Sequence, residues 1–263
     1  MLSKLLKYDI QSKLKFLTVF YILALFFAIL TRIFFNIENS FIMDIIAKIC
    51  SGVTISMIFN ILINNLMRLW VRFKNNLYGD EAYLTHTLPV KKESLYLSKI
   101  LSAVISMFIS VAVIGLTLFV AYYSKENIQF LKNMLLPIAN AYDTSISAIL
   151  ISFLFVFFLQ LLNAVQVGFT GIILGHRMNS SKLPFSVLFG FIAYMATQTL
   201  VLICVFAVAL FNKDFMNLFI TNEMVNIDIL KTIIYMCIFI YSAIVIGIFF
   251  INTKLFKDGV NVD

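Results

Sequence analysis

The stretch that decides the fold is residues 146–173, ISAILISFLFVFFLQLLNAVQVGFTGII. It contains no charged side chain, and it is longer than the roughly 20 apolar residues that cross a bilayer as a helix. Its apolar residues follow one another without the alternation that a membrane β-strand requires. The stretch therefore predicts a transmembrane α-helix.

Five further runs of this kind surround it, in a chain of 263 residues that is 62% hydrophobic and 15% aromatic. No soluble domain of this length buries so much apolar surface, which places the chain among polytopic membrane proteins. We expect an all-α integral membrane fold with six transmembrane helices, in which residues 1–263 form a single transmembrane domain. The predicted spans are Phe16–Phe35, Ile45–Leu66, Ile100–Tyr122, Ile146–Ile173, Phe185–Leu210 and Ile233–Ile251.

The basic residues predict the orientation of these spans. Lys and Arg collect in cytoplasmic loops, and six spans place both termini on the same side of the membrane. Most basic residues fall at the termini and in the second and fourth connections, so we expect both termini to be cytoplasmic. The net charge of +7 is then a topology signal and an attraction to anionic membrane lipid, and it does not indicate nucleic-acid binding.

Residues 1–15 carry an apolar stripe ahead of the first span. Leu2, Leu6, Ile10 and Leu14 recur every four residues, and lysines occupy the other faces. This spacing predicts an interfacial amphipathic helix lying along the inner leaflet. The alternative is a basic terminus that only sets the topology.

Residues 67–99 form the only long polar and basic stretch, with RLWVRFKNNLYGDEAYLTHTLPVKKESLYLSK at 68–99. Gly79 can end the preceding helix, and Asp80 and Glu81 suit the start of a new one. Pro89 stops that helix after about two turns, Ala82 to Leu88. A short helix held between two long ones predicts a cytosolic docking element, and the alternative is an ordinary basic loop.

The residues Gly79–Leu101, GDEAYLTHTLPVKKESLYLSKIL, resemble ABC-2-type transporter permease subunits. In that family a "TLPV" followed by a polar pair and "L…SK" connects the second and third spans. The resemblance implies a permease domain with a coupling helix in segment 67–99, which docks on an ABC-type ATPase subunit present in two copies. It also implies a second permease copy, as a homodimer, in a bacterial inner or plasma membrane. The matching residues are Gly79, Glu81, Thr87, Leu88, Pro89, Val90, Ser98 and Lys99.

A chain of this size with 28 phenylalanines further resembles exporters of antimicrobial peptides, including phenol-soluble modulins. The implied cargo is a hydrophobic or amphipathic peptide, or a lipid-like molecule. No G-x-x-x-x-G-K-[ST] motif occurs in the chain, so ATP and Mg²⁺ would be held by the partner subunit, and this chain would need no cofactor. The residues expected to contact the ATPase are Gly79, Asp80, Glu81, Tyr83, Leu84, His86, Thr87, Leu88 and Pro89.

Amide side chains occur inside the predicted spans. Buried amides in a membrane face protein or a wet cavity, because an unsatisfied polar group in hydrocarbon is costly. They therefore line a candidate translocation path, or they join helices by hydrogen bonds worth about 1 kcal/mol each. The residues are Asn60, Asn64, Gln160, Asn163, Gln166 and Gln198.

Small residues mark two helix-contact faces. Ser102, Ser106 and Ser110 repeat every four residues, and Gly171 and Gly175 form a G-x-x-x-G motif. These faces pack spans within one chain or define a dimer, and the residues alone leave both open.

Enzyme chemistry has no support in the residues. His86 and His176 stand apart in predicted cytosolic loops, without an H-E-x-x-H motif or paired carboxylates in a span. Together with this absence, the resemblance implies the transmembrane permease of an ATP-driven exporter. The alternatives are a membrane immunity protein that sequesters peptides without ATP-driven transport, and an intramembrane enzyme.

Overall fold

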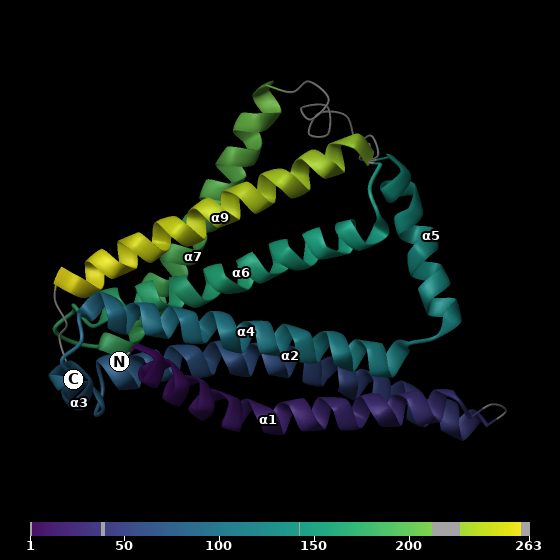
Figure 1. The fold of residues 1–263 in the computed structure, drawn as a ribbon, viewed down its shortest axis with the longest axis horizontal. Coiled ribbons are helices and arrows are strands. Elements are labelled where there is room, and N and C mark those ends of the chain that lie inside the picture. Colours follow the sequence, from purple (N-terminus) through teal and green to yellow (C-terminus); the bar gives the residue numbers. More distant parts are fainter. Residues whose placement is uncertain (1, 38–39, 142, 212–226, 259–263) are drawn as a thin grey trace. The chain divides into compact units, whose positions relative to one another are not determined.

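The computed structural model describes residues 2–37, 40–141, 143–211 and 227–258. These residues are almost entirely helical and contain no strand. Six of their helices are long and apolar enough to cross a membrane. The prediction of an all-α, multi-pass membrane protein with six spans is thereby confirmed (Figure 1).

The helices follow the predicted runs closely, with their ends extended. Each predicted span lies within one long helix, and the short helix α3 occupies the polar stretch between the second and third of them. The bounds are α1 Leu2–Phe35, α2 Phe41–Leu77, α3 Ala82–Thr87, α4 Lys92–Tyr122, α5 Lys125–Ala141, α6 Ile146–Gly175, α7 Lys182–Phe211 and α9 Ile227–Asp258.

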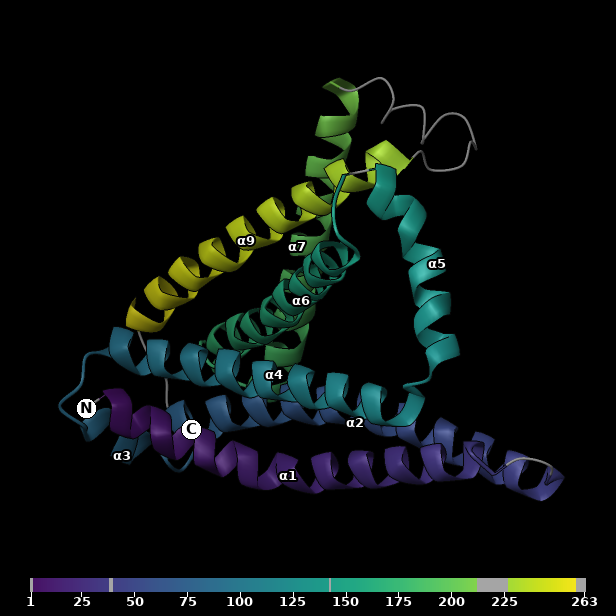
Figure 2. The same cartoon turned by 45° about the vertical axis from the view of Figure 1, so that its right-hand side comes forward.

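The chain divides into two compact units, residues 1–129 and 130–263. In the first unit α1, α2 and α4 lie side by side, as two views show (Figures 1 and 2). Their core includes the fully buried Leu17 and Ala24 of α1 and Ile61 of α2. The second unit packs α6 against α7 and α9.

Both small-residue faces pack spans within this chain. Ser102, Ser106 and Ser110 form a serine stripe on α4, and their hydroxyls are buried against α1 and α2. Ser102 Oγ accepts a hydrogen bond from Lys13 Nζ at 2.6 Å, and Ser110 Oγ lies 2.7 Å from Tyr21 Oη. In the second unit Gly171 of α6 faces Gly190 of α7 so closely that a Cβ on Gly171 would lie 2.6 Å from the Gly190 Cα. Small side chains thus let neighbouring backbones approach each other.

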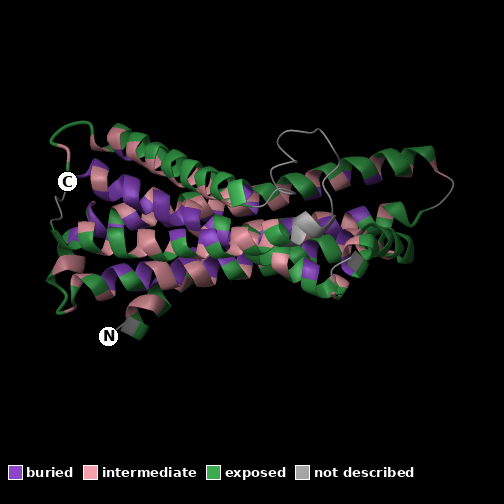
Figure 3. Cartoon of the chain, turned by 90° about the horizontal axis from the view of Figure 1, so that it is seen from above, coloured by how far each residue is buried: buried purple, intermediate pink, exposed green. Residues whose placement is uncertain are grey.

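The outer faces of the helices are apolar and exposed. Large side chains such as Phe155, Phe206 and Phe239 are uncovered within the described chain, and the buried residues form stripes along the helices (Figure 3). In the most apolar part of α7 only 6% of the residues are buried. Lipid is the solvent that such faces require.

The helices extend beyond the membrane core. At 1.5 Å per residue, the 37 residues of α2 span about 55 Å, against roughly 30 Å of hydrocarbon. The extra turns include residues 67–77, which begin the segment expected to be cytosolic. At the same end of the first unit, residues 2–15 are helical as expected, but they continue into the span without a break as part of α1. The interfacial position of this segment stays a prediction.

Candidate functional site

The site begins where α2 ends and the chain turns into α3. The backbone N–H groups of Tyr78 and Gly79 both donate to the carbonyl of Lys74, at 2.8 and 3.1 Å. A Cβ at position 79 would lie 3.2 Å from the Cα of Asn75, tighter than ordinary van der Waals contact. Glycine therefore allows the tight turn that ends α2.

The short helix α3 starts and stops on local signals. The N–H of Ala82 donates to the Gly79 carbonyl at 2.8 Å, and the buried Ala82 side chain anchors the first turn. Leu88 is extended, with ψ of 136°, because a residue before proline avoids the helical region. The sequence predicted this helix at Ala82–Leu88, and it spans Ala82–Thr87.

One side of α3 is held against α2 and the other is exposed. His86 Nε2 lies 3.0 Å from the carbonyl of Leu77, whereas Tyr83 and Leu84 are 66% and 76% exposed. The residues expected to contact the ATPase thus lie together on one projecting element. Those exposed are Asp80, Glu81, Tyr83, Leu84, Thr87, Leu88 and Pro89, and those half-buried are Gly79 and His86.

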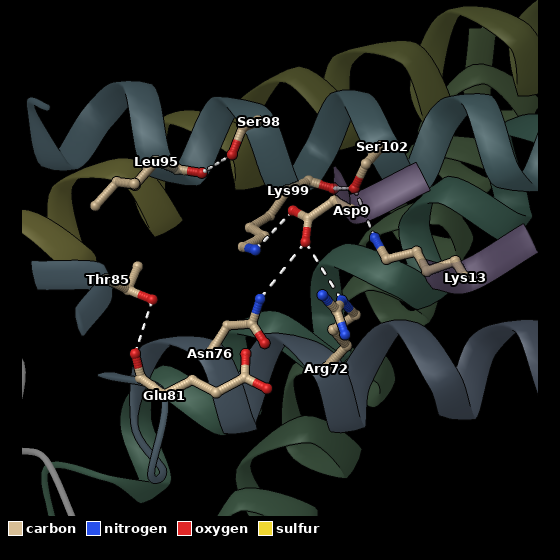
Figure 4. A network of polar contacts seen from close by, with 10 residues as sticks. All are labelled: Asp9, Lys13, Arg72, Asn76, Glu81, Thr85, Leu95, Ser98, Lys99 and Ser102. Carbon is tan, nitrogen blue, oxygen red and sulfur yellow. Dashed lines mark hydrogen bonds and ion pairs between the residues drawn. The ribbon is translucent and has the colours of Figure 1, made fainter. Parts of the chain in front are cut away.

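A buried cluster of charged and polar side chains lies at the base of α3 (Figure 4). We call it the charge cluster: Asp9, Lys13, Arg72, Asn76 and Lys99. Asp9 of α1 is 4% exposed, and its carboxylate accepts from Lys99 Nζ of α4 at 2.6 Å and from Arg72 Nε of α2 at 3.3 Å. One carboxylate thereby joins the three long helices of the unit.

Asn76 connects this cluster to the start of α3. In the orientation drawn in Figure 4, Asn76 Nδ2 lies 3.5 Å from Asp9 Oδ1. With the amide turned by half a rotation, its nitrogen donates to Glu81 Oε2 at 2.6 Å and its oxygen accepts from Lys99 Nζ at 2.9 Å. The second orientation is favoured because it pairs each donor with an acceptor. Glu81 at the α3 N-cap is then linked to α4 through Asn76.

The charge cluster was missed by the sequence reading, which placed residues 1–15, and with them Asp9 and Lys13, in an interfacial amphipathic helix. Both are buried against the neighbouring helices, at 4% and 2% exposure. One signal pointed to it: the serine stripe of α4, extended one turn toward the N-terminus, reaches Ser98 and the adjoining Lys99. A lysine beside a buried polar stripe requires a buried carboxylate partner.

In the second unit the amides expected to line a path make contacts between helices. Gln160 Nε2 of α6 donates to Tyr241 Oη of α9 at 3.2 Å, and Tyr241 donates to Gln198 Oε1 of α7 at 3.3 Å. Asn163 Nδ2 donates to Thr197 Oγ1 of α7 at 3.2 Å. These bonds tie α6, α7 and α9 together.

Two acceptors among these amides remain without a hydrogen bond. Within the part of the chain that the structure describes, Asn163 Oδ1 and Gln166 Oε1 are buried and unpaired. A cavity of about 520 Å³ lies nearby in the same unit, with Thr197, the partner of Asn163, among its lining residues. Its other walls are mainly apolar residues of α7 and α9, including Ala193, Leu200 and Phe239.

The asparagines of α2 divide into a buried and a peripheral set. Asn65 is fully buried, and its Nδ2 donates to Ser110 Oγ at 2.7 Å and to the Ser106 carbonyl at 3.1 Å. Asn60 and Asn64 are half-buried and donate to carbonyls of their own helix, at 3.0 and 2.9 Å. Of the three, Asn65 is therefore the one that joins α2 to α4.

This difference makes a testable prediction. We expect Asn65→Val to destabilise the protein by about 1–3 kcal/mol, since it leaves partners on α4 unsatisfied. Asn64→Val, at the next position, should change stability by a few tenths of a kcal/mol. Thermal unfolding of both variants in the same detergent measures the difference, and equal melting temperatures would contradict the assigned contacts.

Comparison of the chain with models of protein families, with curated proteins and with solved structures finds no match.

Proposed function

We propose that this chain is the membrane permease subunit of an ATP-driven exporter of the ABC-2 type, energised by a separate ATPase subunit. Two permease copies would pair with two ATPase copies in a bacterial cell membrane, with both termini of each permease in the cytoplasm. The observation that carries the proposal is α3, which exposes Tyr83 and Leu84 on one side and is anchored to α2 on the other through His86 and Ala82.

This arrangement supports α3 as a coupling helix. A load applied to its exposed side reaches α2 through the contact of His86 with the Leu77 carbonyl. It reaches α4 and α1 through Glu81, Asn76, Lys99 and Asp9. Packed helices move as rigid rods rather than deforming. Closure of an ATPase dimer beneath α3 would thereby tilt the three helices of the first unit together.

The cargo that fits best is a hydrophobic or amphipathic peptide, or a lipid-like molecule. The cavity of the second unit has mainly apolar walls, with the hydroxyls of Thr170 and Thr197 among its few polar groups. Such a lining disfavours ions and sugars, which need many polar partners.

The test is co-purification of an ATPase from the native membrane. We expect the wild-type chain to bring down an ATPase subunit, and the variant Tyr83→Ala/Leu84→Asp to lose it while still folding. Both side chains are mostly exposed, so their replacement removes contacts to a partner rather than to the chain itself.

Leu183→Asp is the matched control, since Leu183 is also exposed and lies at the start of α7. This variant should keep the ATPase. A well-folded wild type that brings down no ATPase would overturn the exporter proposal and favour peptide sequestration without a motor. Equal loss of the ATPase in the control and the α3 variant would show that α3 is not the docking element.

A further inference from the structure

The first unit has a pocket of its own, lined by residues of α1 and α2. Its volume is about 490 Å³. Two basic side chains, Lys15 and Arg68, and the hydroxyl of Ser12 form its polar lining, and the rest is apolar. The apolar residues are Phe16, Val19 and Phe20.

Arg68 is held in place at this pocket but is not neutralised there. Its guanidinium carbon lies 5.1 Å from the ring centroid of Phe16, which fixes the side chain by a cation–π contact. Its Nε is buried and has no hydrogen-bond partner within the described residues. No acceptor among the described residues pairs with this guanidinium, which lines the pocket, so the site favours an anionic ligand.

The surroundings also carry more positive than negative charge. Lys13 interacts electrostatically with Arg68, Arg72 and Lys99, as well as with Asp9. The carboxylate of Asp9 is engaged by Lys99 and Arg72, and within the described residues it forms no ion pair with Arg68. An anion bound in the pocket would offset this excess of positive charge.

The polar and apolar linings are ordered along α1. Ser12 and Lys15 precede the predicted span Phe16–Phe35, whereas Val19 and Phe20 lie within it. We propose that this pocket binds an anionic phospholipid, with the phosphate at Arg68 and Lys15 and an acyl chain against Phe16, Val19 and Phe20. A phospholipid has the same order, since its phosphate lies at the membrane surface and its chains lie in the core. Guanidinium groups recognise phosphate by paired hydrogen bonds, and basic pockets between membrane helices bind lipid head groups. The site is independent of the exporter function.

The experiment is native mass spectrometry of the full-length protein in detergent with added phosphatidylglycerol or phosphatidylcholine. We expect the wild type to retain one phosphatidylglycerol in preference to phosphatidylcholine. Lys15→Gln/Arg68→Gln should weaken this retention by about twenty-five-fold, from two basic contacts of about fivefold each. Ser12→Trp, which fills the pocket and changes no charge, should weaken it as well.

Lys4→Gln/Lys7→Gln is the matched control, because it removes two charges from exposed positions of the same helix. It should retain the lipid as the wild type does. Equal retention by Ser12→Trp and the wild type, or equal losses in the two double variants, would overturn the site. Displacement of the lipid by millimolar inorganic phosphate, with no effect of acyl-chain length, would show that free phosphate rather than a lipid is the ligand.

Discussion

Replacing Asp9 by Asn is expected to cost about 3–5 kcal/mol of stability, because it removes one partner from a buried ion pair. The carboxylate lies 2.6 Å from Lys99 Nζ and 3.3 Å from Arg72 Nε. Lys99 is itself only 6% exposed, so its buried ammonium group would lose the carboxylate that pairs with it directly. An isolated buried charge is far more costly than an absent pair.

Asp44→Asn is the matched control for Asp9→Asn. Asp44 pairs with Lys48 at 2.7 Å, four residues along α2, but both side chains are exposed. An exposed pair of this kind contributes at most about 1 kcal/mol. Thermal unfolding and the yield of monodisperse protein in one detergent would compare the two variants, and similar losses would show that the charge cluster is not buried as described.

A compensating change separates the ion pair from other effects of Asp9. In Asp9→Asn/Lys99→Met the unpaired ammonium of Lys99 is removed together with the carboxylate, and replacing both members of a buried pair is far less costly than breaking it. We expect this double variant to recover a large part of the stability lost in Asp9→Asn. No recovery would mean that Asp9 acts through Arg72 rather than through Lys99.

Gly171→Ala is expected to destabilise the second unit by about 3 kcal/mol, at the upper end for overpacking a helix contact. The added Cβ would meet the Ser186 carbonyl oxygen and would lie 2.6 Å from the Gly190 Cα. Both are backbone atoms of α7, which cannot rotate away as a side chain can. The helices α6 and α7 must therefore separate, and their other contacts weaken with them.

The facing glycine supplies the control for this prediction. A Cβ on Gly190 would have its nearest neighbour at 3.8 Å, an ordinary van der Waals contact, so Gly190→Ala should leave stability nearly unchanged. Gly115→Ala is a second control, since no described atom lies within 4 Å of its added Cβ. The melting temperatures of the three variants in one detergent measure the effect, and a tolerated Gly171→Ala would contradict the close approach of α6 and α7.

Much of the candidate site was predictable because its signals are local. The residues that start and stop the short helix lie within a few positions of it: Gly79, Asp80, Glu81 and Pro89. From them the sequence placed α3 to within one residue of its observed end. The charge cluster was not predictable in this way. Asp9 and Lys99 are 90 positions apart, and nothing near either residue shows that they form a pair.

The sequence by itself determined the membrane class, the six spans and the position of the short helix. These follow from runs of apolar residues and from glycine and proline, whose effects act on the backbone nearby or on its contact with lipid. Hydrogen bonds inside a helix satisfy the backbone without help from distant residues. For these features the order of residues along the chain is sufficient.

The tertiary structure decided which polar residues are buried. Lys13 is buried and Lys15 exposed, and Asn65 is buried while Asn64 is not. In each case the two residues are alike in chemistry and close in sequence, but successive positions on a helix point about 100° apart. Which of them meets a neighbouring helix depends on how α1, α2 and α4 pack together. That packing rests on contacts between segments far apart in the chain, and it determines where the charge cluster and the phospholipid pocket form.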